Sequence, residues 1–174
     1  MADDVLREWP QREALVGLRQ WPVLESIAVR VARASEFAGA ALLGSMARGE
    51  ADALSDVDLL LVTAAGAFES AWARRHELSD GALVAWEKGD RRLTGVAGHA
   101  WITPQLVFVE CLVAEPASEV RLAEPFVPIV GEDAVFDGVG RRPPIDRSEM
   151  TLERPHEVDA AYEALKDAIR RNMG

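Results

Sequence analysis

Two aspartates separated by one residue open a strongly apolar segment, and this feature constrains the fold more than any other. Asp56 and Asp58 stand in the stretch DVDLLLVT at 56–63, whose aliphatic residues predict a buried strand. Side chains at i and i+2 of a strand share a face, and a rise of about 3.3 Å per residue separates the two Cα atoms by roughly 6–7 Å. Two carboxylates this close repel each other, and burial raises at least one pKa unless a cation lies between them. The pattern therefore predicts a cation site at the start of a strand.

A Gly-Ser pair precedes the aspartates, with ten residues between Ser45 and Asp56. Gly44 and Ser45 follow the small apolar run at 38–43, which predicts another buried strand. A glycine at this position lets the backbone approach a ligand that a side chain would exclude. We expect Ser45 to cap the turn at 46–49, so that free N–H groups point at an anion such as a triphosphate, and Arg48 to add positive charge.

Magnesium is the cation that best fits this combination of carboxylates and an anion-binding turn. Proteins hold Mg²⁺ through one or two carboxylates plus substrate phosphates, and two metals about 3.5–4 Å apart activate a nucleophile and hold a leaving group. The competing interpretation is that Asp56 and Asp58 only solvate the end of a strand, which is the commoner role of an isolated Asp-x-Asp pair. The full arrangement of strand, Gly-Ser, spacer, Asp-x-Asp and second strand favours the site.

The same stretch resembles a known family. GSMARGEA followed by SDVDLLL is similar to the DNA polymerase beta-like nucleotidyltransferase superfamily, and especially to its minimal bacterial members. Leu43-Gly44-Ser45 and Asp56-Val57-Asp58-Leu59 match the family pattern position by position, closely over 38–63 and more loosely to about residue 115. The resemblance implies an α/β (α+β) fold with a mixed β-sheet and helices packed on one face. It also implies metal-dependent nucleotidyl transfer that uses two Mg²⁺ ions, or Mn²⁺, and a nucleoside triphosphate, with ATP expected.

Family members carry a third acid on a later strand beside the Asp-x-Asp strand. Residues 106–113 are apolar except for Glu110 and Cys111, which predicts a central strand covered on both faces. A carboxylate there is costly unless it is paired or bound to metal, so Glu110 is the candidate for the third metal ligand and for the base that accepts the acceptor's proton. Much of the family has Asp at this place, and the alternative is that Glu110 pairs with a basic residue such as Arg92.

Composition bounds the class of protein. The chain has 174 residues, 49% of them hydrophobic, which suggests one domain with a sizeable core. A net charge of −10 argues against nucleic-acid binding, because no basic stripe offsets it. The one cysteine excludes an internal disulfide, and no apolar run approaches the about 20 residues of a membrane span. We therefore expect a cytoplasmic protein without a membrane segment.

Three regions are predicted along the chain: a peripheral N-terminal helix at 1–21, a nucleotidyltransferase core at 22–115, and an irregular extension at 116–174 that ends in an amphipathic helix at 156–172. Within the core, helices are expected at 22–34 and 67–78. Trp86 and Trp101 could stack on a base, although such side chains more often belong to the core.

The acceptor is open on sequence grounds. The first alternative is a small molecule with a hydroxyl group, and the second is a hydroxyl of a partner protein, which the short chain favours. The third alternative is a nucleotide-binding or protein-interaction module, antitoxin-like, that has the fold and little or no turnover. A homodimer or a partner protein could complete the acceptor surface, because about thirty residues after the irregular region are too few for a helical bundle.

Overall fold

The structure is a computed structural model in which residues 5–88, 95–116, 118, 120–123 and 125–142 are described. Contacts divide the chain into two compact units, Met1–Pro143 and Pro144–Gly174, and every described residue belongs to the first unit. The amphipathic helix predicted at 156–172 lies outside the described residues, as does Arg92.

The first unit mixes helices and strands along the chain. The helices are α1 (Arg12–Val16), α2 (Trp21–Arg33), α3 (Gly44–Arg48) and α4 (Phe68–Ala73), with the 3₁₀ turns η1 (Arg75–Glu77) and η3 (Asp133–Phe136). The strands are β1 (Phe37–Leu42), β2 (Val57–Thr63), β3 (Val84–Lys88), β4 (Val96–Ile102), β5 (Phe108–Ala114), β6 (Arg121–Ala123), β7 (Val127–Val130) and β8 (Gly140–Arg142).

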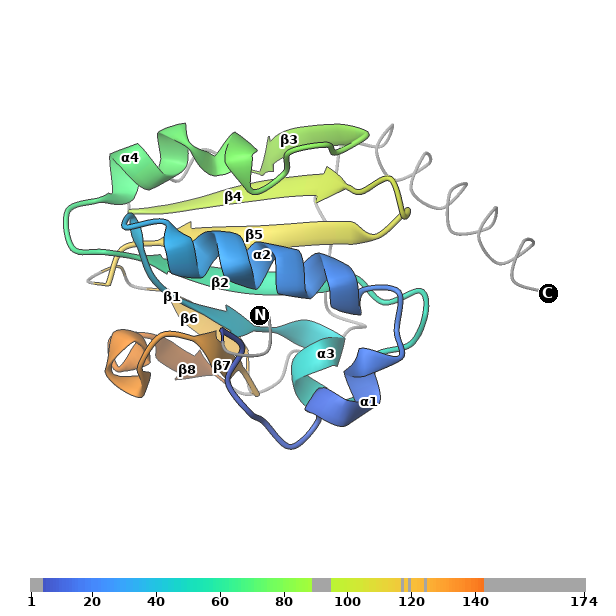
Figure 1. Cartoon of the computed structure of the whole chain (residues 1–174). Coiled ribbons are helices and arrows are strands. Elements are labelled where there is room, and N and C mark those ends of the chain that lie inside the picture. Colours follow the sequence, from blue (N-terminus) through green and yellow to red (C-terminus); the bar gives the residue numbers. More distant parts are fainter. Residues whose placement is uncertain (1–4, 89–94, 117, 119, 124, 143–174) are drawn as a thin grey trace. The chain divides into compact units, whose positions relative to one another are not determined.

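Six of these strands form one mixed sheet in the order β3-β4-β5-β2-β1-β7 (Figure 1). β2 and β5 run parallel, and the other neighbouring pairs in this sheet are antiparallel. β6 and β8 form a separate two-stranded parallel sheet. The predicted α+β class with a mixed sheet is confirmed.

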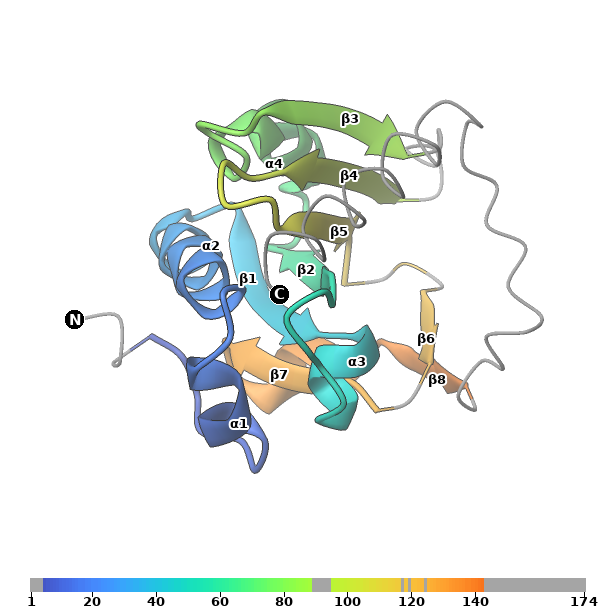
Figure 2. The ribbon, with the colours of Figure 1, turned by 90° about the vertical axis from the view of Figure 1, so that its right-hand side faces the viewer.

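α2 and α4 cover one face of the six-stranded sheet (Figures 1 and 2). In α2, the spacing of Leu24, Ile27 and Val31 places all three on one side of the helix, and all three are buried. Pro22 stands in the first turn, where the N–H that proline lacks has no acceptor within the helix. The buried side of α2 packs with alternate residues of β2, and so fixes which face of that strand is the helix face.

The opposite face of the sheet has its own apolar cluster. Leu60 and Val62 of β2 pack there with Leu122 of β6 and Phe136 of η3. Because side chains alternate along a strand, Asp58 shares this second face with Leu60 and Val62. The carboxylate predicted at this position therefore lies on the side of the sheet away from α2.

The structure differs from the expected organisation in the N-terminal segment and in the extension after residue 115. β7 pairs with β1 as the outer strand of the sheet, so the core includes a strand from the extension at 116–174, where the sequence allows a short strand around 126–130 and is otherwise irregular. The segment expected as a peripheral helix at 1–21 contains the five-residue helix α1, and Leu6 and Trp9 are buried against the core. Both differences arise from contacts between distant parts of the chain, which local patterns do not reveal.

The helix predicted at 67–78 is shorter, because α4 ends at Ala73 and the chain continues as η1. The guanidinium of Arg75 donates to the carbonyl oxygen of Trp72 (2.7 Å) at this junction. A tight connection at 103–107 joins β4 to β5 as an antiparallel pair. Within the described ranges, no helix is long and apolar enough to cross a membrane.

Candidate active site

The turn after β1 lies against Asp58. The backbone N–H of Leu43 donates to the carbonyl oxygen of Asp58 (2.9 Å), which ties the end of β1 to the start of β2. Gly44 has φ of +62°, and a β-carbon placed on it would lie 2.4 Å from Oδ2 of Asp58. Both observations require glycine, since the backbone conformation is left-handed and the space is filled by the carboxylate. The Gly-Ser pair and the second aspartate of the Asp-x-Asp pair are thus in contact.

Ser45 has a different local role from the predicted one. α3 already begins at Gly44, its N-cap is Leu43, and no side chain caps it. Ser45 therefore lies inside the first turn and is nearly buried, at 9% exposure. The turn predicted at 46–49 starts two residues earlier because the left-handed glycine lets the helix begin directly at the end of β1.

Glu110 and Asp58 are direct register partners on the two parallel strands β2 and β5. Neighbouring strands lie about 4.8 Å apart, and register partners point to the same face. The buried thiol of Cys111 reports the same proximity: burial raises its pKa, and the negative charges of Glu110 and Asp58 raise it further. The third acid expected from the family pattern is thus beside Asp58, on the face opposite α2.

Asp56 lies just before the sheet. β2 begins at Val57, so Asp56 is the last residue of the loop between α3 and β2, and it is partly exposed. Asp56, Asp58 and Glu110 each take part in an interaction in this structure. The structure therefore places Asp58 and Glu110 side by side on paired strands, whereas Asp56 belongs to the loop that precedes β2.

Arg48, the predicted phosphate-binding cation, ends α3 and forms an ion pair with Glu50 (Nε to Oε2, 2.7 Å). Its side chain is 27% exposed and that of Glu50 is 64% exposed. A pair this open exchanges readily with solvent and contributes little stability. Arg48 can therefore leave Glu50 for a more highly charged anion at low cost.

Among the described residues, no group of three or more His, Cys, Asp or Glu side chains is arranged to hold a metal ion. The donors that do come together are carboxylates, which are the ligands that Mg²⁺ and Mn²⁺ prefer. The carboxylate of Asp58 also lies directly against the backbone of Gly44, in the space that a β-carbon would fill. The residues fit a cation that obtains its remaining ligands from water and from substrate phosphates.

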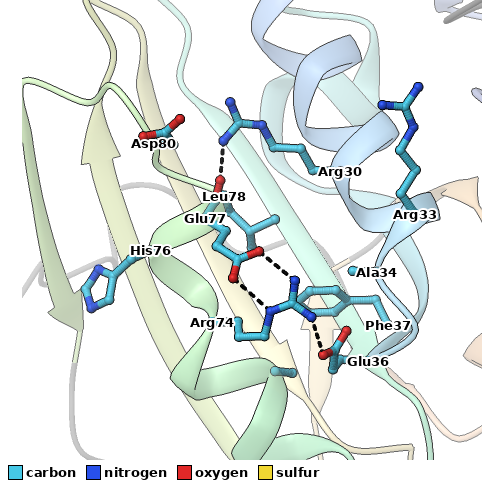
Figure 3. Close-up of a pocket in the computed structure, with 11 residues that line it drawn as sticks. Arg30, Arg33, Ala34, Glu36, Phe37, Arg74, His76, Glu77, Leu78 and Asp80 are labelled. Carbon is cyan, nitrogen blue, oxygen red and sulfur yellow. Dashed lines mark hydrogen bonds and ion pairs between the residues drawn. The ribbon is translucent and has the colours of Figure 1, made fainter.

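A cavity of about 590 Å³ lies elsewhere, on the helix face, between the end of α2, the start of β1 and the α4–η1 segment (Figure 3). Arg74 lies at its centre, donates to both carboxylate oxygens of Glu77 (2.8 Å each) and also pairs with Glu36. These hydrogen bonds from Arg74 lower the pKa of Glu36 and of Glu77. Arg30 donates to the carbonyl oxygen of Glu77. Arg74, Glu36 and Glu77 thus pair with one another, and no predicted site residue lines the cavity, so we place the active site at the carboxylates.

The two tryptophans differ in their surroundings. Trp101 is 2% exposed and belongs to the core, which excludes it as a base-stacking surface in this conformation. Trp86 is partly exposed and stacks on Phe108 with ring centroids 5.5 Å apart. Through the register partners Trp86–Ala100 and Ala100–Glu110, it lies on the same face of the sheet as the carboxylates. Trp86 is thus the tryptophan that the fold leaves available near the site.

One buried residue near the site gave no signal in the sequence. Gln20 immediately precedes α2, is fully buried, and donates from its side-chain amide to the carbonyl oxygens of Asp52 (2.9 Å) and Ser55 (2.7 Å). A single glutamine before a helix matches no motif, and its partners are more than thirty residues away in the chain. Its contacts could be found only in three dimensions.

Comparison with protein families gives one match. The family described as "Nucleotidyltransferase domain" matches residues 24–120. The matched segment begins in α2 and continues past β5, so it contains the turn at Gly44, both aspartates and Glu110. A search of curated proteins finds no match. The matched segment covers more than half of the 174 residues.

Proposed function

Because the chain belongs to the nucleotidyltransferase domain family, and nucleotidyl transfer is the activity of that family, we propose that it moves a nucleoside monophosphate group, AMP as the expected one, from a triphosphate to a hydroxyl group. The observation that carries this proposal is the arrangement of Gly44, Asp58 and Glu110 at one edge of the sheet. Carboxylates, an open backbone turn and an adjacent basic side chain are the parts that a triphosphate-metal complex needs.

The proposed reaction is an in-line displacement at the α-phosphorus. The acceptor oxygen forms a new P–O bond, the bond to the bridging oxygen breaks, and pyrophosphate leaves with the bonding electron pair. The proton of the acceptor hydroxyl passes to the carboxylate of Glu110. A glutamate in this role is one methylene longer than the aspartate common in the family, so it reaches the site from a slightly more distant backbone.

Asp56, Asp58 and Glu110 are the residues that would hold the divalent ions, two Mg²⁺ or alternatively Mn²⁺. When bound, these ions neutralise charge on the phosphates and make the acceptor oxygen more acidic. Ser45 and Arg48 bind the β- and γ-phosphates, and Gly44 admits them close to the backbone. A chain with a net charge of −10 needs such local cations to attract an anionic substrate.

Two kinds of acceptor fit the proposal: a hydroxyl-bearing small molecule, or a hydroxyl on a partner protein or a second copy of the chain. The arrangement of Gly44, Asp58 and Glu110 is compatible with both kinds of acceptor. A second candidate function is nucleotide binding or protein interaction with little or no turnover. Two observations favour it: Glu110 stands where much of the family has aspartate, and the described carboxylates are not grouped as a ready-made three-ligand site.

The test is transfer of label from each α-³²P-labelled triphosphate in the presence of Mg²⁺ or Mn²⁺. Acceptors are offered as a panel of hydroxyl-bearing small molecules, including aminoglycosides, and as a cell lysate. Asp58→Asn removes one charge at the site, and Asp80→Asn is the matched control, since Asp80 is exposed and lies on the helix face. We expect label on an acceptor with wild type and Asp80→Asn, and none with Asp58→Asn.

Label on a small molecule selects the first kind of acceptor, and label on a protein band selects the second. Tight binding of the metal-triphosphate complex without transfer to any acceptor, unchanged in Glu110→Asp, supports the binding module instead. Equal transfer by wild type and Asp58→Asn would contradict the proposed site.

A further inference from the structure

The two aspartates of the site are held in place by different means. Asp58 lies within β2, opposite Glu110, and its carboxylate rests against the backbone of Gly44. Asp56 precedes the first register pair of β2 and β5, which is Val57 with Val109. The sheet therefore fixes Asp58 directly, whereas the location of Asp56 depends on how the loop at 50–56 is held.

The loop has a tight internal turn between Asp52 and Ser55. The carboxylate of Asp52 accepts a hydrogen bond from the N–H of Leu54 (2.9 Å), and the hydroxyl of Ser55 accepts one from the N–H of Asp52 (2.9 Å). The bond from Leu54 is the main reason that the pKa of Asp52 is lowered. These bonds are exposed and join residues at most three apart, so they give the turn its shape. At its start the loop is attached by the hydrogen bond from the N–H of Glu50 to the carbonyl oxygen of Ser45 (2.9 Å) and by Ala51, which packs against the core.

Gln20 attaches the later part of the loop, next to Asp56, to the start of α2. Its Nε2 donates both of its hydrogens, one to the carbonyl oxygen of Asp52 (2.9 Å) and one to that of Ser55 (2.7 Å). The Ser55 carbonyl belongs to the same peptide group as the N–H of Asp56, so the hydrogen bond acts on the unit that leads into the aspartate. Gln20 is itself fixed, because it is fully buried and its carbonyl oxygen accepts the helical hydrogen bond from Leu24, a core residue of α2.

Only glutamine provides this contact at this length. Two carbonyl oxygens require two N–H donors, which a glutamate side chain lacks, and asparagine is one methylene shorter. The Oε1 of Gln20 is buried and has no hydrogen-bond partner in the structure, which costs stability. The two hydrogen bonds from Nε2 are therefore the contacts through which this buried amide acts on the loop.

We infer that Gln20 is a positioning residue: it connects α2 to the loop at 50–56 and sets the place from which Asp56 reaches the metal-triphosphate complex. The inference rests on the nucleotidyl transfer proposed above. Gln20 acts through the backbone and has no contact with the reacting atoms. Loss of the amide is expected to loosen the loop, weaken binding at Asp56, and leave the Gly44–Asp58 contact unaltered.

The experiment compares wild type with Gln20→Met, which keeps the length and bulk of the side chain and removes both donors. Thr63→Val is the matched control, because Thr63 is fully buried, its hydroxyl has no hydrogen-bond partner in the structure, and it lies at the far end of β2. Amide hydrogen exchange in the nucleotide-free protein measures the loop at 52–56. Calorimetric titration with Mn²⁺ and a non-hydrolysable ATP analogue measures the site.

For Gln20→Met we expect exchange at the amides of Leu54 and Ser55 to be at least about tenfold faster, and the affinity for the Mn²⁺–analogue complex to fall by about tenfold. Thr63→Val is expected to change neither quantity. If Gln20→Met does not fold, Gln20→Asn is measured in the same way. Its loop exchange rate and its affinity for the Mn²⁺–analogue complex are expected to lie between the values for wild type and those expected for Gln20→Met.

Unchanged exchange in the loop overturns the structural link. Faster exchange with unchanged affinity overturns the positioning role, because the loop would then be looser without consequence for the site. If wild type does not bind the Mn²⁺–analogue complex at all, the proposed function fails, and the positioning role fails with it. The exchange data still report separately whether Gln20 holds the loop, so the two failures are distinguishable.

Discussion

The contact between Gly44 and Asp58 makes Gly44→Ala the most direct perturbation of the proposed site. A methyl group on this residue meets Oδ2 of Asp58 at 2.4 Å, whereas ordinary contacts begin near 3.4 Å. The carboxylate must therefore rotate or retreat by about 1 Å, and a displacement of that size at a reacting centre can cost about 100-fold in rate. We expect at least a tenfold loss of affinity for the metal-triphosphate complex, with transfer activity reduced by about 100-fold.

The same substitution also strains the backbone. Alanine at φ of +62° costs about 1–2 kcal/mol relative to glycine, since its β-carbon crowds the following carbonyl oxygen. For a chain of 174 residues this corresponds to a decrease in Tm of roughly 2–8 °C. Thermal unfolding followed by circular dichroism measures this part of the effect separately from binding.

Gly66→Ala is the matched control for the strain. Gly66 has φ of +71°, and a β-carbon there meets nothing within 4 Å. It lies in the turn after β2, at the end of that strand away from the site. Gly66→Ala should lower Tm by a similar amount and leave the affinity for the metal-triphosphate complex unchanged. If Gly44→Ala binds the complex as tightly as Gly66→Ala does, the reasoning that places the phosphates at this turn is refuted.

Three further predictions concern the buried histidine, the basic side chain of α3 and the core. His99 is fully buried, and burial lowers its pKa to about 4. In the unfolded chain the imidazole is protonated below its ordinary pKa of 6.5, so the free energy of unfolding should fall by up to about 3 kcal/mol between pH 7 and pH 4. Urea titrations at several pH values measure this fall, and His99→Gln should make the free energy of unfolding depend less on pH. Arg48→Gln should weaken ATP binding several-fold and leave AMP binding nearly unchanged, as measured by calorimetry. Its Tm should stay within about 2 °C of that of wild type, because the ion pair with Glu50 is exposed. Equal losses of affinity for ATP and AMP would contradict a role at the β- and γ-phosphates. Leu24→Ala should cost about 2–5 kcal/mol in urea denaturation, since Leu24 is fully buried between α2 and the sheet, and a loss below about 1 kcal/mol would contradict that packing.

The parts of the fold that follow from local pattern were predicted correctly. The helical spacing in α2 and the apolar runs of β1, β2 and β5 each lie within a stretch of fewer than fifteen residues. Gly44 was expected from its local sequence to let the backbone approach a ligand, and the structure adds that its backbone is left-handed, with φ of +62°. In each of these segments, neighbouring residues alone determine the structure.

The features that the sequence did not reveal depend on distant partners. The sequence allows a short strand around 126–130, but the place of β7 in the sheet depends on its pairing with β1, some ninety residues earlier. Gln20 reaches Asp52 and Ser55 across more than thirty residues. Arg74 binds Glu36 across a similar separation, in the cavity of Figure 3. Such contacts satisfy polar groups that burial has brought together, so they become visible only once the core is assembled.

The position of the third carboxylate follows from the topology of the sheet. β1 and β2 are antiparallel with Leu42 opposite Leu59, which places the turn after β1 beside the start of β2. β5 is parallel to β2, so its first residues lie at the same edge and Glu110 stands opposite Asp58. If β5 ran antiparallel over the same span, Glu110 would face Leu61, about 10 Å along the strand from Asp58 at about 3.3 Å per residue. The parallel pairing of β2 with β5 therefore brings the carboxylate of Glu110 close to the Gly-Ser turn, although Glu110 lies more than sixty residues later in the chain.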